Sequence, residues 1–246
     1  MLDVFKTSVL IYRIKQSFRN FVYMVSQDEK LNGSTDKGVR DRLFESAEEL
    51  FCERGFAGTS VRDIAASAKC NIASVNYYFG GKEKLYHEVW RRHLIMMRDT
   101  RIASIDKVMS QNNGKPKLED LLKSFAEAFV GSLVDESSAQ RLCKLMAREW
   151  IDNHLPVNMF LEDIMMPTLN AMRGALVRIC PGLDESKIPL IVVSIVGQLL
   201  HVLHVKAVFQ QIDNTDMHKF DLAQSIDHVV KFSTAGIRGY IEEKKE

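Results

Sequence analysis

The stretch from Phe44 to Val89 reads FESAEELFCERGFAGTSVRDIAASAKCNIASVNYYFGGKEKLYHEV and decides the fold. Apolar residues recur at helical spacing at its start: Leu43, Ala47, Leu50 and Phe51. Gly55 follows Arg54, and a glycine at this position commonly caps the C-terminus of a helix. The pattern therefore predicts an amphipathic first helix that ends at Arg54.

A second, shorter helix is predicted to begin at Ser60. Ser60 and Asp63 have the S-x-x-D spacing of a capping box, in which each side chain accepts from the other residue's backbone N–H. The inner face of this helix is formed by small and branched apolar residues: Val61, Ile64, Ala65 and Ala68.

A third helix is predicted over Ile72–Phe79. Asn71 is a favourable N-cap, Gly80-Gly81 ends the helix, and Lys82 opens a fourth, longer helix. Two short helices joined by a tight turn at Lys69-Cys70 form a helix-turn-helix candidate.

The third helix carries side chains suited to DNA. Ala73 and Ser74 are small enough to permit close approach to base edges, and Asn76, Tyr77 and Tyr78 supply hydrogen-bond donors. Six cations are available to surround it: Arg40, Arg42, Arg62, Lys69, Lys82 and Lys84. The pattern alone leaves open a plain three-helix core with surface tyrosines.

The same stretch resembles the DNA-binding domain of the tetracycline-repressor (TetR) family of bacterial regulators. The matching residues are Ala47, Leu50, Phe51, Gly55, Thr59, Ile64, Ala65, Tyr78-Phe79, Lys82-Glu83 and Leu85. The resemblance implies a dimer of all-helical subunits, each with an N-terminal DNA-binding domain and a variable C-terminal domain that binds a small-molecule effector.

Family roles carry over by position. Thr59, Ser60 and Arg62 match the start of the second helix, which usually contacts phosphate, and Tyr78 and Lys82 match further phosphate contacts. The base-reading face corresponds to Ile72–Tyr77, after Asn71. The full set of predicted DNA-binding residues is Arg40, Thr59, Ser60, Arg62, Asn71, Ile72, Ala73, Ser74, Asn76, Tyr77, Tyr78 and Lys82.

Three residues depart from the family pattern. Lys69 stands where the turn commonly has glycine, and a left-handed lysine costs on the order of 1 kcal/mol. Cys70 replaces a usual valine, and Asn76 replaces a frequent tyrosine. The Asn-Tyr-Tyr-Phe-Gly-Gly-Lys-Glu ending resembles one branch of the family, which has a characteristic C-terminal domain.

The remaining sequence, 98–246, also has helical periodicity and no alternating strand pattern. Leu118–Phe129 and Ala139–Ile151 are expected to be helical, Pro167 is expected to kink or split the helix that contains it, and Cys180-Pro181-Gly182 ends that helix. We therefore predict an all-α protein: an extension over 1–36, a helix-turn-helix domain over 37–97 that contains the three-helix unit, and a larger helical bundle for effector binding and dimerisation over 98–246.

Leu190–Phe209 is apolar nearly all round. Its length is close to that of a membrane span, but Gln198, His201, His204 and Lys206 argue against one. A helix without a polar face is normally buried. By resemblance, this helix and the last one, Leu222–Glu243, form the dimer interface.

Effector-pocket candidates are apolar, aromatic or histidine residues of the C-terminal bundle: Phe129, Met146, Trp150, His154, Met165, Met166 and His201. Such linings suit apolar or drug-like molecules. The alternative is that these residues simply form the core.

Composition agrees with a soluble, folded regulator. The 246 residues carry 33 Lys+Arg against 32 Asp+Glu, and 46% of the residues are hydrophobic. Four widely spaced cysteines suggest reduced thiols in a cytoplasmic protein rather than a disulfide framework. The basic segment Met1–Val25 lacks a cleavage site, so it is expected to be a frayed helix, an arm for DNA or membrane, or sequence upstream of a start at Met24.

The sequence thus predicts a cytoplasmic, dimeric repressor that binds a palindromic DNA operator and is released by a small molecule, with no enzymatic activity, cofactor, metal or membrane partner. Two alternatives remain: a DNA-binding structural protein without an effector, and an enzyme or metal sensor that uses His201 and His204. No nucleophile elbow, phosphate-binding loop or dinucleotide fingerprint supports an enzyme.

Overall fold

A computed structural model describes residues 38–111, 116–133, 141, 145, 146, 149, 154–210 and 221–242, and every element in these ranges is helical. The predictions for residues 1–36, for Trp150 and for most of the helix Ala139–Ile151 lie outside the described residues. The chain divides into two compact units, Met1–His93 with Asp135–Met159, and Leu94–Val134 with Phe160–Glu246. The described residues 141, 145, 146, 149 and 154–159 thus group with the first unit, although they fall within the range 98–246 predicted for the C-terminal domain.

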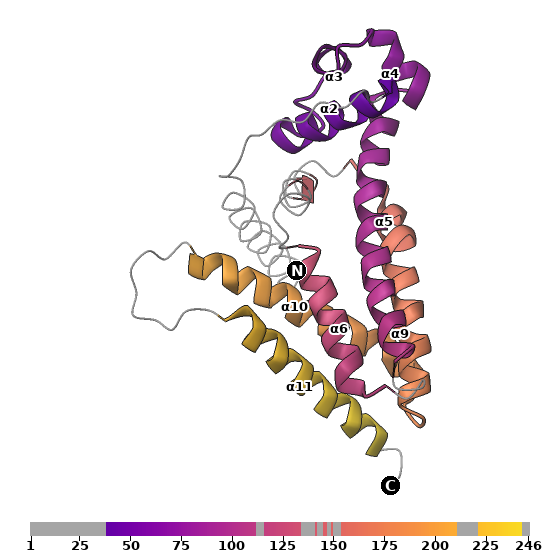
Figure 1. Cartoon of the computed structure of the whole chain (residues 1–246), viewed down its shortest axis with the longest axis vertical. Coiled ribbons are helices and arrows are strands. Elements are labelled where there is room, and N and C mark those ends of the chain that lie inside the picture. The colour runs from indigo at the N-terminus through magenta and orange to yellow at the C-terminus, as the bar shows by residue number, and fades with distance from the viewer. Residues whose placement is uncertain are drawn as a thin grey trace, which may run out of the picture. The chain divides into compact units, whose positions relative to one another are not determined.

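The first unit contains the predicted helix-turn-helix (Figure 1). Its helices are α2 (Val39–Arg54), α3 (Val61–Ser67), α4 (Ile72–Phe79) and the beginning of α5 (Lys82–Met109). The predicted bounds of the third helix are confirmed, as are the end of the first at Arg54 and the start of the fourth at Lys82. Large apolar side chains fill the centre of this unit: Leu43, Phe51, Ile64, Val75, Phe79, Leu85 and Tyr86.

Local chemistry fixes the ends of α3 and α4. Both halves of the capping box are present, because Ser60 Oγ accepts from Asp63 N at 3.1 Å and the Asp63 carboxylate accepts from Ser60 N at 3.0 Å. Asn71 Oδ1 accepts from Ala73 N at 2.9 Å. Lys69, in the turn between the helices, has φ 53° and is the one non-glycine residue with positive φ in the described part of the chain. The turn therefore keeps the left-handed conformation with a lysine, whereas the cost of that conformation led us to expect a slightly different turn.

Gly58, in the connection between α2 and α3, has no room for a side chain. A Cβ there would lie 2.4 Å from the backbone oxygen of Arg54, and backbone cannot move aside as a flexible side chain can. We expect Gly58→Ala to lower the free energy of unfolding by about 1–3 kcal/mol, measured by urea denaturation. Gly174→Ala is the control, since a Cβ there meets nothing within 4 Å in the interior of a helix. Gly174→Ala should raise the free energy of unfolding by about 0.5–1 kcal/mol. Equal effects of the two variants would show that a Cβ is tolerated at Gly58.

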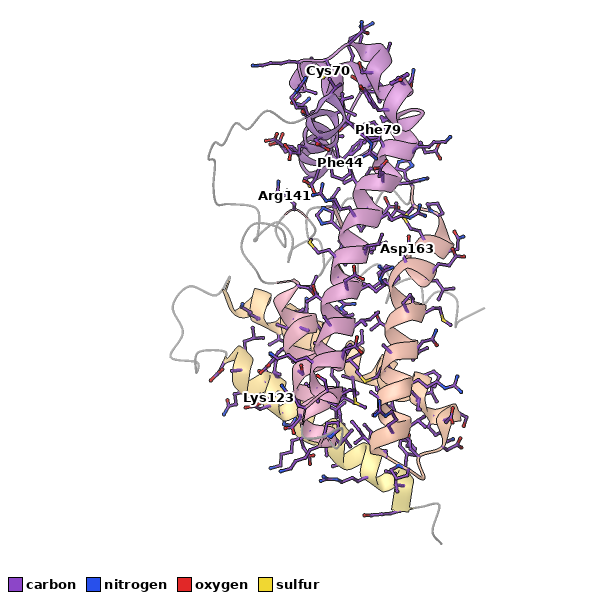
Figure 2. The ribbon with its side chains drawn as sticks, turned by 45° about the vertical axis from the view of Figure 1, so that its right-hand side comes forward. Phe44, Cys70, Phe79, Lys123, Arg141 and Asp163 are labelled. Carbon is purple, nitrogen blue, oxygen red and sulfur yellow. The ribbon has the colours of Figure 1, made fainter. Side chains whose placement is uncertain are left out.

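The second unit is a helical bundle formed by the rest of α5 with α6 (Leu118–Gly131), α9 (Met166–Ile179), α10 (Ile188–Gln210) and α11 (Leu222–Glu242). Helices α6 and α11 pack side by side (Figure 1). Two exposed ion pairs join them, Arg238 with Glu119 at 2.6 Å and Lys123 with Asp227 at 3.1 Å. Lys123 is labelled on this unit in Figure 2.

The predicted break at Pro167 takes the form of a change in helix type. The short α8 (Val157–Phe160) leads into a π-helix, η2 (Leu161–Met165), which passes directly into α9. Pro167 lies in the first turn of α9, directly after the π turn. The backbone stays helical from Val157 to Ile179, so the structure shows a change of helix type before the proline and not the predicted split. The predicted end at Cys180 is confirmed.

Helix α10, preceded by the 3₁₀ turn η3 (Glu185–Lys187), has apolar residues on two faces. Ile191, Val192, Ile195 and Leu199 are buried in the bundle, whereas Leu190 and Val193 are 64% and 61% exposed. Among the described helices, the segment Glu185–Lys206 alone is long and apolar enough to cross a membrane. This helix packs against α6, α9 and α11 within the second unit.

Candidate nucleic-acid interface

Helix α4 has one buried and one exposed side. Val75 and Phe79 are buried and hold the helix on the core of the first unit, while Ile72, Ala73, Asn76 and Tyr77 are exposed. Tyr77 is 82% exposed, and its ring lies edge-on to Tyr78 at 4.9 Å between centroids. Large aromatic groups left in solvent on a short helix are available to a partner.

The predicted contacts at the start of α3 divide into two kinds. Ser60 and Arg62 are exposed. Thr59 is buried instead, and its hydroxyl is within hydrogen-bond distance of the carbonyl oxygens of Gly55, at 2.8 Å, and Leu50, at 3.1 Å. The structure therefore gives the Thr59 side chain a structural role at the end of α2 and corrects the expectation that it contacts phosphate.

The predicted cations also differ in what they contact. The Arg40 guanidinium pairs with Glu88 and lies 5.0 Å from the ring centroid of Phe79. Arg42 Nε donates to the carbonyl of Ala68 at 3.4 Å. The cations that are exposed, and that form no ion pair with any residue described, are Arg62, Lys69 and Lys84.

Lys82, at the first position of α5, is bound to the connection between α2 and α3. Its Nζ donates to the carbonyl oxygens of Phe56 and Thr59, both at 3.0 Å, and lies 4.1 Å from the centroid of the Phe56 ring. An ammonium group has three donors, and this geometry uses two of them. Its predicted contact with phosphate stays a prediction, but an internal role is evident.

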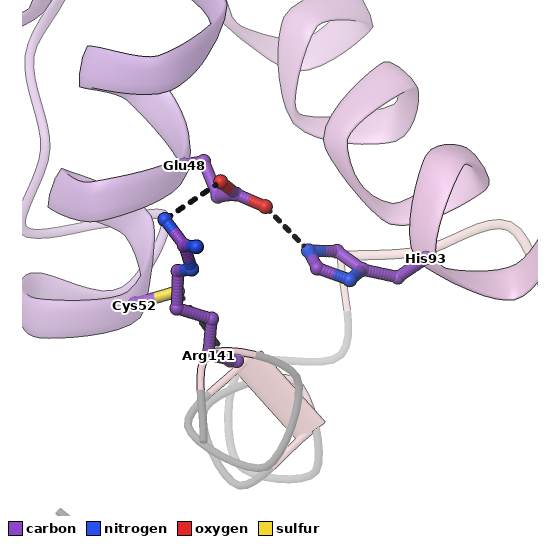
Figure 3. Close-up of polar contacts among 4 residues, drawn as sticks. All are labelled: Glu48, Cys52, His93 and Arg141. Carbon is purple, nitrogen blue, oxygen red and sulfur yellow. Dashed lines mark hydrogen bonds and ion pairs between the residues drawn. The ribbon is translucent and has the colours of Figure 1, made fainter. Parts of the chain in front are cut away.

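A polar cluster around the buried Glu48 and His93, which sequence reasoning missed, joins α2 to α5. His93 Nε2 donates to Glu48 at 2.6 Å, and Nη1 of the exposed Arg141 lies 3.5 Å from the other oxygen of the same carboxylate (Figure 3). Cys52 Sγ donates to the backbone oxygen of Arg141 at 3.4 Å. No local motif signals this cluster, because Glu48, His93 and Arg141 are 45 or more residues from one another and Glu48 looks like one of several surface acids on α2.

Burial raises the pKa of Glu48, but the hydrogen bond and charge of His93, together with the charges of Arg141 and Arg92, outweigh this effect, so the pKa lies below its ordinary value of 4.5. A lowered pKa in the folded state means that Glu48 stabilises the fold fully above about pH 4.5 and loses this contribution as the pH falls further. We expect Glu48→Gln to lower the free energy of unfolding by about 1–3 kcal/mol at pH 7, and by less at pH 3.5. Urea unfolding at both pH values measures these losses, and Glu49→Gln, at an exposed position, is the control. If Glu48→Gln lowers the free energy of unfolding equally at pH 7 and at pH 3.5, the pKa of Glu48 is not lowered by the fold.

The effector-pocket candidates fall in both units. In the first, Met146 is half-buried and His154 is exposed, with its ring 4.3 Å from that of Phe56. In the second, Phe129 is buried, whereas Met165, Met166 and His201 are exposed. Their roles stay predictions, and Trp150 lies outside the described residues.

The two histidines of α10 have no further metal ligand near them in the part of the chain that is described. Their ring centroids are 6.3 Å apart, and no group of three His, Cys, Asp or Glu side chains suited to a metal exists among those residues. Burial lowers the pKa of His204, and the charge of His201 lowers it further.

These features define a helix-turn-helix protein with a second helical unit. Residues 43–89 match the family model "Bacterial regulatory proteins, tetR family", and residues 118–237 match the model "HTH-type transcriptional dual regulator CecR, C-terminal domain". Over residues 43–89 the chain is thus similar to the TetR family of bacterial regulatory proteins, and over residues 118–237 it is similar to the C-terminal domain of an HTH-type transcriptional regulator.

Individual relatives support the same family. The chain is 56% identical over 44 residues to the probable HTH-type transcriptional regulator YttP of Bacillus subtilis, covering 18% of this chain and 21% of YttP. It is 40% identical over 51 residues to the HTH-type transcriptional repressor NicS of Pseudomonas putida, covering 21% of this chain and 24% of NicS. The matches therefore span about a quarter or less of these curated relatives.

Solved structures share the fold over most of the chain. A putative transcriptional regulator from Pseudomonas aeruginosa superposes with a TM-score of 0.63 at 17% identity, covering 83% of this chain and 93% of that one. A putative TetR-family regulator from Mesorhizobium loti gives 0.61 at 19% identity, covering 80% and 96%. At these identities the likeness shows the fold alone.

Proposed function

We propose that this protein is a cytoplasmic repressor that binds a palindromic DNA operator as a homodimer and is released by a small-molecule effector. The observation that carries the proposal is the exposed side of α4, with Tyr77 at its centre, on a rigidly capped helix-turn-helix. The match of residues 43–89 to the TetR-family model supports it.

In the proposed complex, α4 enters the major groove. The N-terminal residues of a recognition helix contact the base edges. The residues of α4 that face the bases are therefore those near its start that are not buried: Ile72, Ala73, Ser74, Asn76 and Tyr77. Phosphate contacts come from Arg62, Lys69 and Lys84, whose charges are exposed, and from Ser60 and Tyr78. Arg40, Asn71 and Lys82 complete the rim, each already engaged within the protein.

The proposed dimer uses an exposed apolar surface of the second unit, the α10–α11 face. We define it by Leu190, Val193 and Leu200 on α10 and by Phe232 and Tyr240 on α11. Gly197 and Gly236 lie on the same two helices, and a Cβ at either would meet nothing within 4 Å, so a second pair of helices has room to approach closely. A patch of this kind on a soluble protein indicates a protein partner.

The test is fluorescence anisotropy with DNA from upstream of the protein's own gene and with random DNA, over a salt series. We expect the specific fragment to bind tighter by about a thousandfold or more. Binding that ignores sequence and falls steeply with salt would favour the alternative of a DNA-binding structural protein.

Single substitutions separate base contacts from phosphate contacts. Tyr77→Phe and Ser74→Ala are expected to change the preference among operator variants, whereas Lys84→Ala is expected to weaken binding to all DNA alike, with the salt slope reduced by about 1. A competition assay on a library of operator mutants measures both quantities. Identical effects of the three substitutions on operator and random DNA would show that the roles are assigned wrongly.

A further inference from the structure

Arg101, in the part of α5 that belongs to the second unit, is a buried cation with no anionic partner among the residues that the structure describes. Its side chain is only 6% exposed, its Nε has no hydrogen-bond partner, and none of the residues described forms an ion pair with it. Burial lowers the pKa of Arg101 to about 10, and no nearby acid offsets this effect. The guanidinium lies over the ring of Phe129 on α6, 4.0 Å from the centroid.

The buried acids in the described part of the chain both have partners. Glu48 pairs with His93 and Arg141, and Glu149 accepts from Tyr86 Oη at 2.7 Å. Arg101 has only an aromatic face, which attracts a cation but offers no acceptor for its N–H groups. A buried guanidinium left in this condition is unfavourable unless a bound molecule completes it.

Buried apolar side chains lie near Arg101 in the sequence of α5 and on α6. On α5, Met97 and Ile105 lie one turn before and one turn after Arg101, and both are buried. Phe125 on α6 is also buried, and its ring centroid is 6.1 Å from that of Phe129. Ser124 Oγ donates to the backbone oxygen of Ser104 at 3.1 Å and ties α6 to α5 beside this site. The arrangement provides one fixed positive charge within apolar surroundings.

We propose that Arg101 and Phe129 form the anion-binding end of the effector site, and that the effector is an amphipathic anion with a carboxylate or similar group on an apolar body. The guanidinium donates two parallel hydrogen bonds to the anionic group, as arginine does to carboxylates. This inference rests on the proposed function, because it identifies the chemical class of the effector, and it narrows the expectation of an apolar or drug-like molecule.

The experiment compares two fluorescent dyes that differ only in a charged group: 8-anilinonaphthalene-1-sulfonate and its neutral parent, N-phenyl-1-naphthylamine. Both are titrated against the full chain without DNA. The variants are Arg101→Met, Arg101→Lys as a second variant that keeps a cation, and Arg178→Met as a control that removes an exposed arginine from the same unit. Decanoate and decanol then compete with the bound sulfonate dye.

We expect Arg101→Met to weaken binding of the sulfonate dye at least tenfold, with little effect on the neutral dye, and Arg101→Lys to weaken it less. Arg178→Met should bind both dyes as the unaltered protein does, and decanoate should displace the sulfonate dye while decanol at the same concentration does not. Without ligand, Arg101→Met should melt no lower than the unaltered protein, because an unpaired buried charge has been replaced by an apolar side chain.

Three results would overturn the proposal: no saturable binding of the sulfonate dye, equal binding by Arg101→Met, or equal displacement by decanol. The DNA assay is scored separately, with Arg101→Met expected to bind the operator normally and to resist release by decanoate. Charge-dependent dye binding without any specific DNA binding would leave the anion site standing and refute the repressor. Specific DNA binding without Arg101-dependent dye binding would support the repressor and refute the anion site.

Discussion

Val193→Glu is expected to convert the protein to a monomer and to weaken operator binding by about 10²-fold or more. Val193 is 61% exposed on the α10–α11 face, so the charge has ample room in the isolated subunit and the fold should persist. In the proposed dimer the same charge would be buried without a partner, which is strongly unfavourable. A monomer engages one half-site, and loss of the linked second half-site forfeits a factor of about 10²–10⁴.

Sedimentation velocity measures the change in assembly, and anisotropy on a palindromic operator measures the change in affinity. Val177→Glu is the matched control, because Val177 is also exposed but lies on α9, away from this face. The control should remain dimeric with full affinity. Persistence of the Val193→Glu dimer would show that the subunits associate through some other surface.

Lys82→Met is expected to lower the free energy of unfolding by about 2–4 kcal/mol, since a hydrogen bond to a charged group contributes about 1.5–3 kcal/mol and two are lost. Methionine retains most of the apolar stem, so the loss isolates the ammonium and its bonds to the carbonyls of Phe56 and Thr59. These bonds hold the start of α5 on the connection that precedes α3. The variant should therefore melt earlier even without DNA and should also bind DNA less tightly.

Lys84→Met is the control. Lys84 lies two residues after Lys82 and is exposed, so this substitution removes an equal charge from the surface. It should lower DNA affinity without a change in the melting temperature. Thermal unfolding followed by circular dichroism separates the two variants. An unaltered melting temperature for Lys82→Met would mean that Lys82 acts on phosphate alone.

Local sequence signals determined most of the helix-turn-helix. The bounds of α4, the capping box at Ser60 and the start of α5 were all predictable, because each depends on interactions within a few residues. The sequence also indicated an irregularity near Pro167, but the π turn inside a continuous helix was not predicted.

Burial separated residues that look alike in sequence. Thr59 and Ser60 are both hydroxyl residues at the start of α3, yet Thr59 is buried on α2 while Ser60 is exposed at the cap. Lys82 and Lys84 both read as surface cations, yet only Lys82 reaches the carbonyls of the preceding connection. In each pair, one side chain is held by backbone carbonyls of the end of α2 or of the connection that follows it, and the other is exposed. The sequence pattern around these residues does not show which member is held.

By itself, the sequence determined the class of fold, the bounds of the helix-turn-helix and the likeness to the TetR family, because capping residues, glycine stops and apolar periodicity act over short distances. Only the tertiary structure revealed the Glu48–His93–Arg141 cluster and the unpaired charge of Arg101. In both, the environment of a charged group is set by residues that are far away in the chain, and desolvation and pairing exist only once the helices have packed.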